Sequence, residues 1–286
     1  MSDRLSNHLS KKKKPRRRII GLVPAAGKAA RLAPLPCSKE LFPIGFRPVG
    51  QNRSLRPKVV CHYLLEKLRT AGIKETYLIL RKGKWDIPAY FGDGKMLNMH
   101  LAYLMMDLPF GVPYTLDQAY PFVQDAMVAF GFPDIMFDQD DAFVQLLNRQ
   151  AESDADIVLG LFPTDHPQKW DMVDFDEDGG IRRIVIKAPR VRLRYAWIIA
   201  VWTPIFTGFL HQYIADRKHM MEDESSQNRI ADERELCIGD VIQAAIHNEV
   251  QIDSVRFPDS GCLDIGTPED MVNAVQITKR NFENFG

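Results

Sequence analysis

Apolar residues along the chain fall into two patterns, short continuous runs and longer segments with helical periodicity. Residues 19–23 (IIGLV) form a β-branched apolar run that ends at Pro24, which predicts a buried strand. Residues 58–70 carry apolar side chains at helical spacing and are followed by Gly72, which predicts a helix and its stop. A second buried strand is predicted at residues 76–80 (TYLIL). Strand, loop, helix and strand in this order are typical of a parallel sheet with a right-handed crossover.

The same alternation continues to the C-terminus. Further strands are predicted at residues 97–103, 127–132, 156–162, 172–175, 181–186, 195–202 and 250–256. Helices are predicted at residues 140–152, 204–217, 239–248 and 268–284, the last with Thr267 as N-cap, Pro268 in its first turn and Asp270 as a capping-box acid. Asp178-Gly179 predicts a hairpin turn. Residues 220–236 are charge-dense, which predicts an exposed loop or surface helix. The alternation has no linker or repeat, which favours one α/β domain over residues 19–286.

Charge is unevenly distributed, although the formal net charge is zero. Residues 1–18 hold eight Lys or Arg against one Asp, and the rest of the chain is acidic by the same amount. Such a basic tail could bind nucleic acid or an anionic membrane surface. No aromatic residue is interleaved with its charges to stack on a base, and the body is acidic. We therefore predict a disordered, solvated tail at residues 1–18 and no specific nucleic-acid partner.

Cysteine usage and hydropathy limit the class of protein. The four cysteines are far apart and form no C-x-x-C pair, which fits a reducing compartment and predicts a cytoplasmic protein. No apolar run approaches the ~20 residues that cross a bilayer, and the basic N-terminus lacks the apolar core of a secretory signal. The apolar content of 45% is ordinary for a globular protein with a sizeable core.

The loop PAAGKAARLAP, residues 24–34, follows the first predicted strand. In an open α/β sheet this position lies at the carboxyl edge, where ligands bind. Small residues let backbone N–H groups approach phosphate oxygens, and nearby cations neutralise charge. The loop matches neither G-x-x-x-x-G-K-[ST] nor G-x-G-x-x-G, so alone it is compatible with a phosphate loop or an alanine-rich helix start.

Three further segments change this picture. Residues 36–43 (PCSKELFP) follow the loop, residues 132–136 read FPDIM, and residues 260–268 read SGCLDIGTP. Together they resemble the nucleotide-sugar pyrophosphorylases, sugar-1-phosphate nucleotidyltransferases of the glucose-1-phosphate thymidylyl- and uridylyltransferase type. The residues matching the family's first signature are Pro24, Ala26, Gly27, Arg31, Leu32, Pro34, Lys39, Leu41 and Pro43. The resemblance covers roughly residues 19–280 and implies a three-layer α/β/α, Rossmann-like nucleotidyltransferase fold with a mixed, mostly parallel central sheet.

The resemblance also implies a reaction. A sugar-1-phosphate oxygen, with glucose-1-phosphate as the expected acceptor, attacks the α-phosphorus of dTTP or UTP and releases pyrophosphate, with Mg²⁺ as cofactor. Arg31 and Lys39 are implied as the catalytic cations, because Arg grips phosphate in bidentate fashion and Lys acts as a mobile point charge. Asp134 and Asp264 are implied as Mg²⁺ ligands, since Mg²⁺ prefers one or two carboxylates together with phosphates and water. The implied substrate-binding residues are Ala26, Gly27, Lys28, Ala29, Ala30, Gln118 and Lys187.

The sequence departs from the family pattern at several positions. Ala29 and Ala30 stand where the family has Gly and Thr. If position 29 requires a positive φ, alanine costs about 1 kcal/mol; if it opens a helix, alanine is harmless. Residues 105–130 compress the family's base- and sugar-reading elements and lack its glycine, and Gln118 or Gln124, with Asp125-Ala126, could take their place. Lys187 matches the family's Lys-Pro motif only with a shift of one residue.

Three functions therefore stay open. The first is an active, Mg²⁺-dependent sugar-1-phosphate nucleotidyltransferase. The second is a non-catalytic relative that binds a nucleotide or NDP-sugar as a sensor or partner subunit, which the altered loop motivates. The third is a nucleotidyltransferase for another phosphorylated alcohol, such as a choline- or glycerol-type phosphate, which the compressed central segment motivates. Many relatives are dimers or tetramers, so the resemblance leaves a homo-oligomer open.

Overall fold

The computed structural model describes residues 18–107, 110–177, 179–187, 191–222 and 235–283. Their central element is a nine-stranded mixed sheet in the order β10-β9-β11-β6-β1-β4-β5, with β8 against β11 and β12 against β8. The strands of this sheet are β1 Ile19–Pro24, β4 Glu75–Arg81, β5 His100–Met106, β6 Met127–Gly131, β8 Ile157–Pro163, β9 Asp171–Phe175, β10 Ile181–Ile186, β11 Tyr195–Trp202 and β12 Ile252–Arg256.

Strand β1 is central and lies between two parallel neighbours, β4 on one side and β6 on the other. Parallel pairing continues from β4 to β5 and recurs between β8 and β12, whereas β11 runs antiparallel to β6, β8 and β9. Ile20, Leu22 and Val23 of β1 are at most 2% exposed. A strand buried on both faces requires this continuous apolar run.

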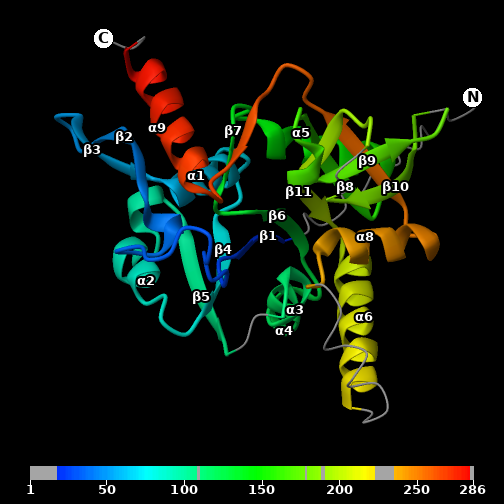
Figure 1. Ribbon diagram of the computed structural model, residues 1–286. Helices are drawn as coiled ribbons and strands as arrows, with labels where there is room; N and C mark the ends of the chain where they lie inside the picture. Colours follow the sequence, from blue (N-terminus) through cyan, green and yellow to red (C-terminus); the bar gives the residue numbers. More distant parts are fainter. Residues whose placement is uncertain (1–17, 108–109, 178, 188–190, 223–234, 284–286) are drawn as a thin grey trace, which may run out of the picture.

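Helices cover both faces of the sheet (Figure 1). On one face α1 (Val60–Thr70) and α5 (Ala142–Ser153) pack in a cluster that includes Leu64, Leu68 and Phe143. On the other face α3 (Val112–Asp117), α4 (Tyr120–Val123), α6 (Pro204–Glu222) and α8 (Ile238–His247) pack in a second cluster that includes Phe206 and Ile242. The predicted three-layer α/β/α architecture is confirmed.

Two small ladders stand outside the main sheet. One is the hairpin of β2 (Pro43–Val49) and β3 (Ser54–Val59), and α9 (Pro268–Glu283) lies beside it at one end of the molecule (Figure 1). The second joins β7 (Ile135–Phe137) to β13 (Cys262–Asp264). Short helices complete the described chain: α2 Asp86–Phe91 and the 3₁₀ turns η1 Lys39–Leu41, η2 Lys95–Leu97 and η3 Pro167–Lys169.

Most predicted elements are confirmed, β10 and β11 with the predicted bounds. The strand predicted at 97–103 was misplaced: η2 occupies residues 95–97, Asn98 adopts a positive φ, and β5 starts only at His100. The predicted helix at 58–70 loses its first two residues to β3, and the helix predicted to end at residue 217 extends to Glu222. Thr267 caps α9 as predicted, because its Oγ1 accepts a hydrogen bond from the Asp270 N–H at 3.3 Å.

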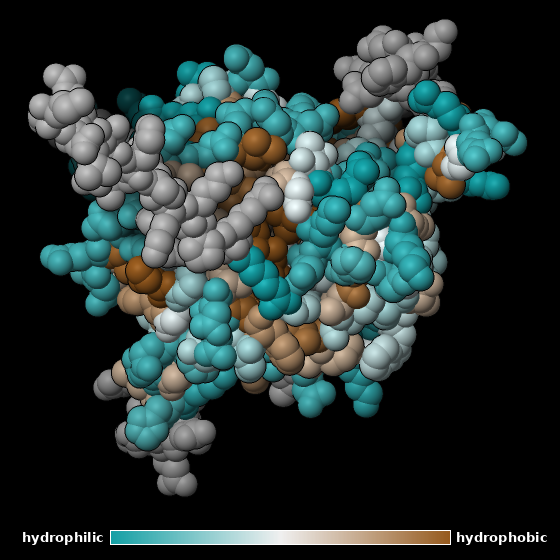
Figure 2. Space-filling model, turned by 180° about the vertical axis from the view of Figure 1, so that it is seen from behind, coloured by the Kyte–Doolittle hydropathy of each residue, from teal (hydrophilic) through white to brown (hydrophobic). Residues whose placement is uncertain are grey.

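Only part of the N-terminal tail and of the predicted loop at 220–236 lies among the described residues. Of residues 1–18 only Arg18 is described, and its Nε donates to Glu75 Oε2 at 2.8 Å. Residues 223–234 lie outside the described chain. No described helix has the length and apolarity to span a bilayer. Seen from behind, the surface is mainly hydrophilic, with hydrophobic side chains gathered near the middle of that face (Figure 2).

Candidate active site

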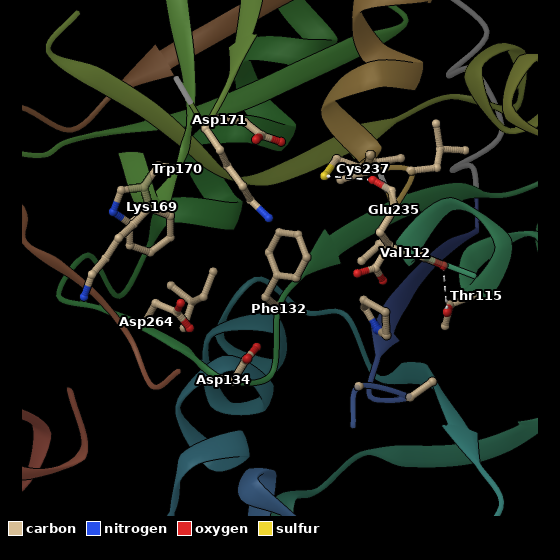
Figure 3. A pocket seen from close by; sticks show the side chains of 18 of the residues that line it. Val112, Thr115, Phe132, Asp134, Lys169, Trp170, Asp171, Glu235, Cys237 and Asp264 are labelled. Carbon is tan, nitrogen blue, oxygen red and sulfur yellow. Dashed lines mark hydrogen bonds between the residues drawn. The ribbon is translucent and has the colours of Figure 1, made fainter. Parts of the chain in front are cut away.

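A cavity of about 290 Å³ opens at the carboxyl end of β1, the strand that lies between β4 and β6 in the sheet (Figure 3). Ligands of open α/β sheets bind in this position. The cavity is lined by Pro24, Ala26 and Gly27 at the end of β1, Lys39 and Glu40 of η1, Gly111, Val112 and Thr115 around α3, Phe132, Asp134 and Ile135 after β6, Lys169, Trp170 and Asp171 at the start of β9, Lys187, Trp197, residues 235–238, and Asp264.

Asp134 and Asp264 approach each other through the β7–β13 ladder. Asp134 directly precedes β7, and Asp264 is the last residue of β13 and lies opposite Ile135. The Ile265 N–H donates to the Asp134 carbonyl at 2.9 Å, which closes the ladder at its site end. Both carboxylates line the cavity (Figure 3). The structure thus brings together the two aspartates that the sequence implied, although 130 positions separate them.

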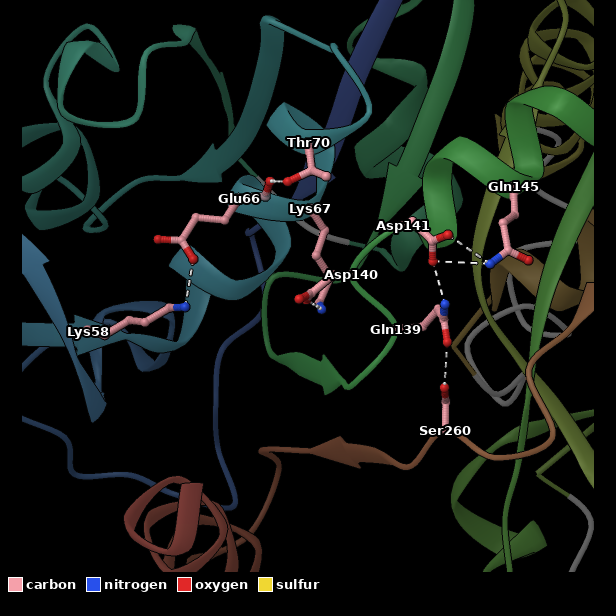
Figure 4. Close-up of polar contacts among 9 residues, drawn as sticks. All are labelled: Lys58, Glu66, Lys67, Thr70, Gln139, Asp140, Asp141, Gln145 and Ser260. Atoms are coloured by element: carbon pink, nitrogen blue, oxygen red, sulfur yellow. Dashed lines mark hydrogen bonds and ion pairs between the residues drawn. The ribbon is translucent and has the colours of Figure 1, made fainter. Parts of the chain in front are cut away.

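A polar network holds the other end of this ladder (Figure 4). Ser260 Oγ donates to Gln139 Oε1 at 3.1 Å, and Gln139 Nε2 donates in turn to Asp141 at the start of α5. On the opposite side Lys67 of α1 forms a 2.6 Å ion pair with Asp140. The segments that carry the two aspartates are therefore attached to the helical layer and are not free loops.

Lys39 supplies the positive charge closest to the two carboxylates. Its Nζ forms an ion pair with Asp134 Oδ2, and both side chains are only 15% exposed. Burial by itself lowers the pKa of the Lys39 ammonium, but the carboxylates of Asp134, Glu40 and Asp264 together more than offset this, and the pKa lies above its ordinary value. Burial, reinforced by the negative charge of Asp134, raises the pKa of Asp264 to about 6, against the opposing effect of Lys39 and Arg31.

This donor set fits Mg²⁺. Two carboxylates repel each other in a partly buried site, and a divalent cation between them would relieve the repulsion. Mg²⁺ is commonly held by one or two carboxylates, with substrate phosphates and water as its remaining ligands. Among the described residues, no group of three or more His, Cys, Asp or Glu side chains is placed to hold a metal.

Arg31 lies beside the Asp264 segment. A Cβ added to Gly266 would come within 2.9 Å of both Arg31 Nη2 and Asp264 Oδ2. Glycine at position 266 therefore leaves room for the guanidinium next to the Asp264 carboxylate. Arg31 itself is exposed and is not part of the cavity lining.

The loop after β1 is a turn and not a helix start. Ala29 has a φ of 52°, and its carbonyl accepts hydrogen bonds from Leu32 N at 2.9 Å and Ala33 N at 3.1 Å. Of the two conformations considered for position 29, the structure has the left-handed one, which disfavours alanine. Gly27 is exposed, with open space where a Cβ would be.

The other implied substrate-binding residues are distributed differently. Ala26, Gly27 and Lys187 line the cavity, whereas Lys28 and Ala29 line an adjoining groove that also contains Lys39. Ala30 is exposed and lines neither. Gln118 and Gln124, the C-caps of α3 and α4, are both exposed and also line neither. The α3 segment contributes Gly111, Val112 and Thr115 instead.

Sequence reasoning missed two features of the site. Glu40 is 1% exposed and pairs at 2.6 Å with Lys84, itself 4% exposed, which ties η1 to the β4–α2 connection. Burial raises the pKa of Glu40 despite this partner. The indole of Trp197 lines the cavity with its buried Nε1 unpaired among the described residues. Glu40 could have been suspected from its place next to Lys39, whereas Trp197 lies in an apolar run that gave no signal.

This geometry is that of a nucleotide-binding α/β protein, and comparison with known proteins identifies its class. The family model for nucleotidyl transferases matches residues 20–281, so the chain belongs to the nucleotidyl transferase family. The resemblance inferred from the sequence is thereby confirmed at the level of the family.

Individual relatives are distant. The low-salt glycan biosynthesis nucleotidyltransferase Agl11 of Haloferax volcanii is 25% identical over 261 residues, which are 90% of this chain. The chain spans 65% of the length of that curated relative. A crystal structure from Bacillus anthracis, assigned as a glucose-1-phosphate thymidylyltransferase and solved with sucrose, superposes with a TM-score of 0.72 at 19% identity and covers 91% of this chain and 95% of its own. At that identity the similarity concerns the fold.

Proposed function

We propose that this protein transfers a nucleotidyl group from a nucleoside triphosphate to a sugar-1-phosphate, with dTTP or UTP as donor and glucose-1-phosphate as acceptor. The observation that carries the proposal is the convergence of Lys39, Asp134 and Asp264 at the carboxyl edge of β1, beside a small-residue loop. The family of the chain and the printed activities of its relatives support the same reaction class.

The residues of the site have distinct tasks in this reaction. The loop at Ala26 and Gly27 lets the donor approach the backbone closely. Lys39 neutralises charge at the α-phosphate, where the acceptor oxygen attacks, and Arg31 steadies the phosphates by bidentate hydrogen bonds. Positioning and charge neutralisation account for most of the catalysis, since phosphoryl chemistry needs little covalent help.

Asp134 and Asp264 would hold Mg²⁺. The ion, when bound, supplies charge neutralisation for the phosphate oxygens. Lys39 forms an ion pair with the Asp134 carboxylate and is therefore placed beside the proposed position of the ion.

The acceptor phosphate is expected near Lys187. This lysine lines the cavity together with Trp170 and Trp197, and no ion pair of Lys187 occurs among the described residues. Its ammonium is therefore available to the acceptor phosphate. Lys169, by contrast, is engaged with Asp270 at 2.9 Å.

The test is pyrophosphate release measured over a panel of nucleoside triphosphates and acceptors, which includes hexose-1-phosphates, choline phosphate and glycerol phosphate. We expect turnover with a sugar-1-phosphate, and its loss in Asp134→Asn. The matched control is Asp259→Asn, an exposed carboxylate outside the cavity lining, which should retain activity. Turnover only with a non-sugar acceptor would replace the proposed acceptor.

The second candidate, a binding protein without catalysis, is favoured by the strained alanine at position 29. It would be supported if the protein bound a nucleotide or an NDP-sugar in calorimetry but released no pyrophosphate with any pair of substrates.

A further inference from the structure

The wall of the cavity that α3 forms is connected to α6 through a buried carboxylate behind it. Gly111, Val112 and Thr115 line the cavity, and Figure 3 shows Thr115 across the cavity from Trp170. Asp117 ends the same helix but does not line the cavity. Because each residue of a helix is turned by about 100° from the one before, Asp117 points about 200° away from Thr115. One short helix thus carries a wall of the cavity on one face and a carboxylate on the other.

Two side chains of α6 hold this carboxylate, and we call Asp117, His211 and Lys218 the α3 clamp. His211 Nδ1 lies 2.6 Å from Asp117 Oδ1, and Lys218 Nζ donates to Oδ2 at 3.0 Å. The Asp117 side chain is only 6% exposed. A carboxylate can only accept hydrogen bonds, so Nδ1 of His211 carries the proton of this bond. His211 and Lys218 are about two helical turns apart and therefore reach toward α3 from the same side of α6.

His211 also connects α4 to this clamp. Its imidazole stacks on the ring of Tyr120, with the ring centroids 3.7 Å apart and the planes inclined by 6°. Tyr120 is the first residue of α4, and both α3 and α4 pack against α6 (Figure 1). Helices shorter than about 12 residues are marginal in water, so α3 and α4, with six and four residues, depend on tertiary contacts for their position.

Apolar packing already attaches α3 to the body of the protein. Leu116 is 3% exposed and belongs to the second cluster together with Phe206 and Leu210 of α6. Such contacts are non-directional, whereas a hydrogen bond to a carboxylate requires a defined distance and angle. A buried ion pair adds little stability compared with apolar residues of similar volume. The α3 clamp is therefore better explained by the orientation that it imposes on α3 than by the stability that it contributes.

We propose that the three residues of the α3 clamp are positioning residues, which fix the rotation of α3 and so shape the wall of the cavity that receives the nucleoside of the donor. This inference rests on the proposed function. With the α-phosphate at Lys39 and the acceptor near Lys187 and Trp170, the α3 side of the cavity is left for the nucleoside. No clamp residue lines the cavity, so the clamp acts through Val112 and Thr115.

The experiment compares KM for the triphosphate with KM for the acceptor in variants of the clamp. His211→Ala removes both the bond to Asp117 and the ring that stacks on Tyr120, and Lys218→Met removes the second donor. We expect each variant to raise KM for the triphosphate about 3- to 30-fold, because the wall that contacts the nucleoside is no longer held in one orientation. KM for the acceptor should stay unchanged, since Lys187 and Trp170 do not depend on α3.

Two further variants show whether the effect comes from the bond to Asp117. His211→Asn keeps an N–H donor near the position of Nδ1 and should recover most of the affinity for the triphosphate. The matched control is His219→Ala, which removes an exposed histidine of the same helix and should behave like the wild type. Circular dichroism and the melting temperature report whether each variant folds. Lys218 is 48% exposed, so Lys218→Met tests the clamp even if His211→Ala does not fold.

Calorimetric binding of dTTP and UTP separates this inference from the function on which it rests. Nucleotide affinity that depends on His211 in a protein without turnover would overturn the catalytic function and leave the clamp in place. Three results overturn the clamp even if the enzyme turns over: unchanged nucleotide affinity in both clamp variants, equal losses for donor and acceptor, or a matching loss in His219→Ala. A lower melting temperature with unchanged affinity likewise assigns these residues a structural role only.

Discussion

The ammonium of Lys39 is paired with the carboxylate of Asp134 where the cavity meets the adjoining groove lined by Lys28 and Ala29. The two residues come from η1 and from the segment after β6, which flank the carboxyl end of β1. This contact places a cation against one of the two carboxylates that line the cavity.

Removal of this charge should reduce catalysis. We expect Lys39→Met to lower kcat by at least about 10²-fold, because a charge positioned at the reacting phosphate is lost. Steady-state kinetics on the best substrate pair of the panel measures this, and Lys74→Met, which removes an exposed lysine ahead of β4, serves as control. Equal loss in both variants would show that the effect is not specific to the site.

The positive φ of Ala29 predicts a gain in stability from glycine. A left-handed alanine destabilises the native state by about 1–2 kcal/mol, which glycine avoids. Glycine is also more flexible in the unfolded chain, and this offsets about 0.4–1 kcal/mol of the gain. We therefore expect Ala29→Gly to raise the free energy of unfolding by about 0.5–1 kcal/mol in urea titrations. Ala30→Gly is the matched control, because Ala30 is not among the described residues with positive φ, and it should give no gain.

Because Glu40 and Lys84 form a buried ion pair, we expect a large loss of stability when one partner is removed. Lys84→Met leaves the Glu40 carboxylate buried without its partner, which should cost about 3–5 kcal/mol of unfolding free energy. The double variant Glu40→Gln/Lys84→Met should recover part of this, since the unpaired charge is gone. Chemical unfolding of the two single variants and the double variant completes a double-mutant cycle. If the changes in unfolding free energy simply add, the two residues are not coupled.

His62 predicts a loss of stability in acid. Its side chain is fully buried, and its Nδ1 accepts a hydrogen bond from the Val59 N–H at 3.1 Å. Burial, together with the charges of Arg47 and Lys58, lowers the pKa of the imidazole from 6.5 to about 3. Between these values the unfolded chain binds a proton that the native state does not, so stability falls as the pH falls.

The slope that His62 contributes in this window approaches about 1.4 kcal/mol per pH unit. In His62→Gln, whose amide oxygen can still accept from Val59, this contribution should disappear. Unfolding free energies of both proteins at pH 7, 6, 5 and 4 measure it. Parallel profiles over the whole range would show that another group causes the acid sensitivity.

Local signals in the sequence predicted the elements that carry the site. A short continuous run of β-branched and other apolar residues is typical of a doubly buried strand, so β1, β4 and β11 were predictable. The β2–β3 hairpin was not, because its exposed residues show no alternation of apolar and polar positions. The short helices α3 and α4 were missed for a related reason, since one or two turns give too little periodicity to identify a helix.

Patterns among neighbouring residues were enough to predict the α/β architecture and the loop with its cations, and the family resemblance pointed to Asp134 and Asp264. Three relationships became known only from the folded chain: Asp134 and Asp264 meet at the β7–β13 ladder, Ala29 is left-handed, and Arg81 and Lys28 line one groove. These relationships join residues far apart in the chain or depend on backbone torsion. Sheet register and packing determine them, and neither can be derived from local composition.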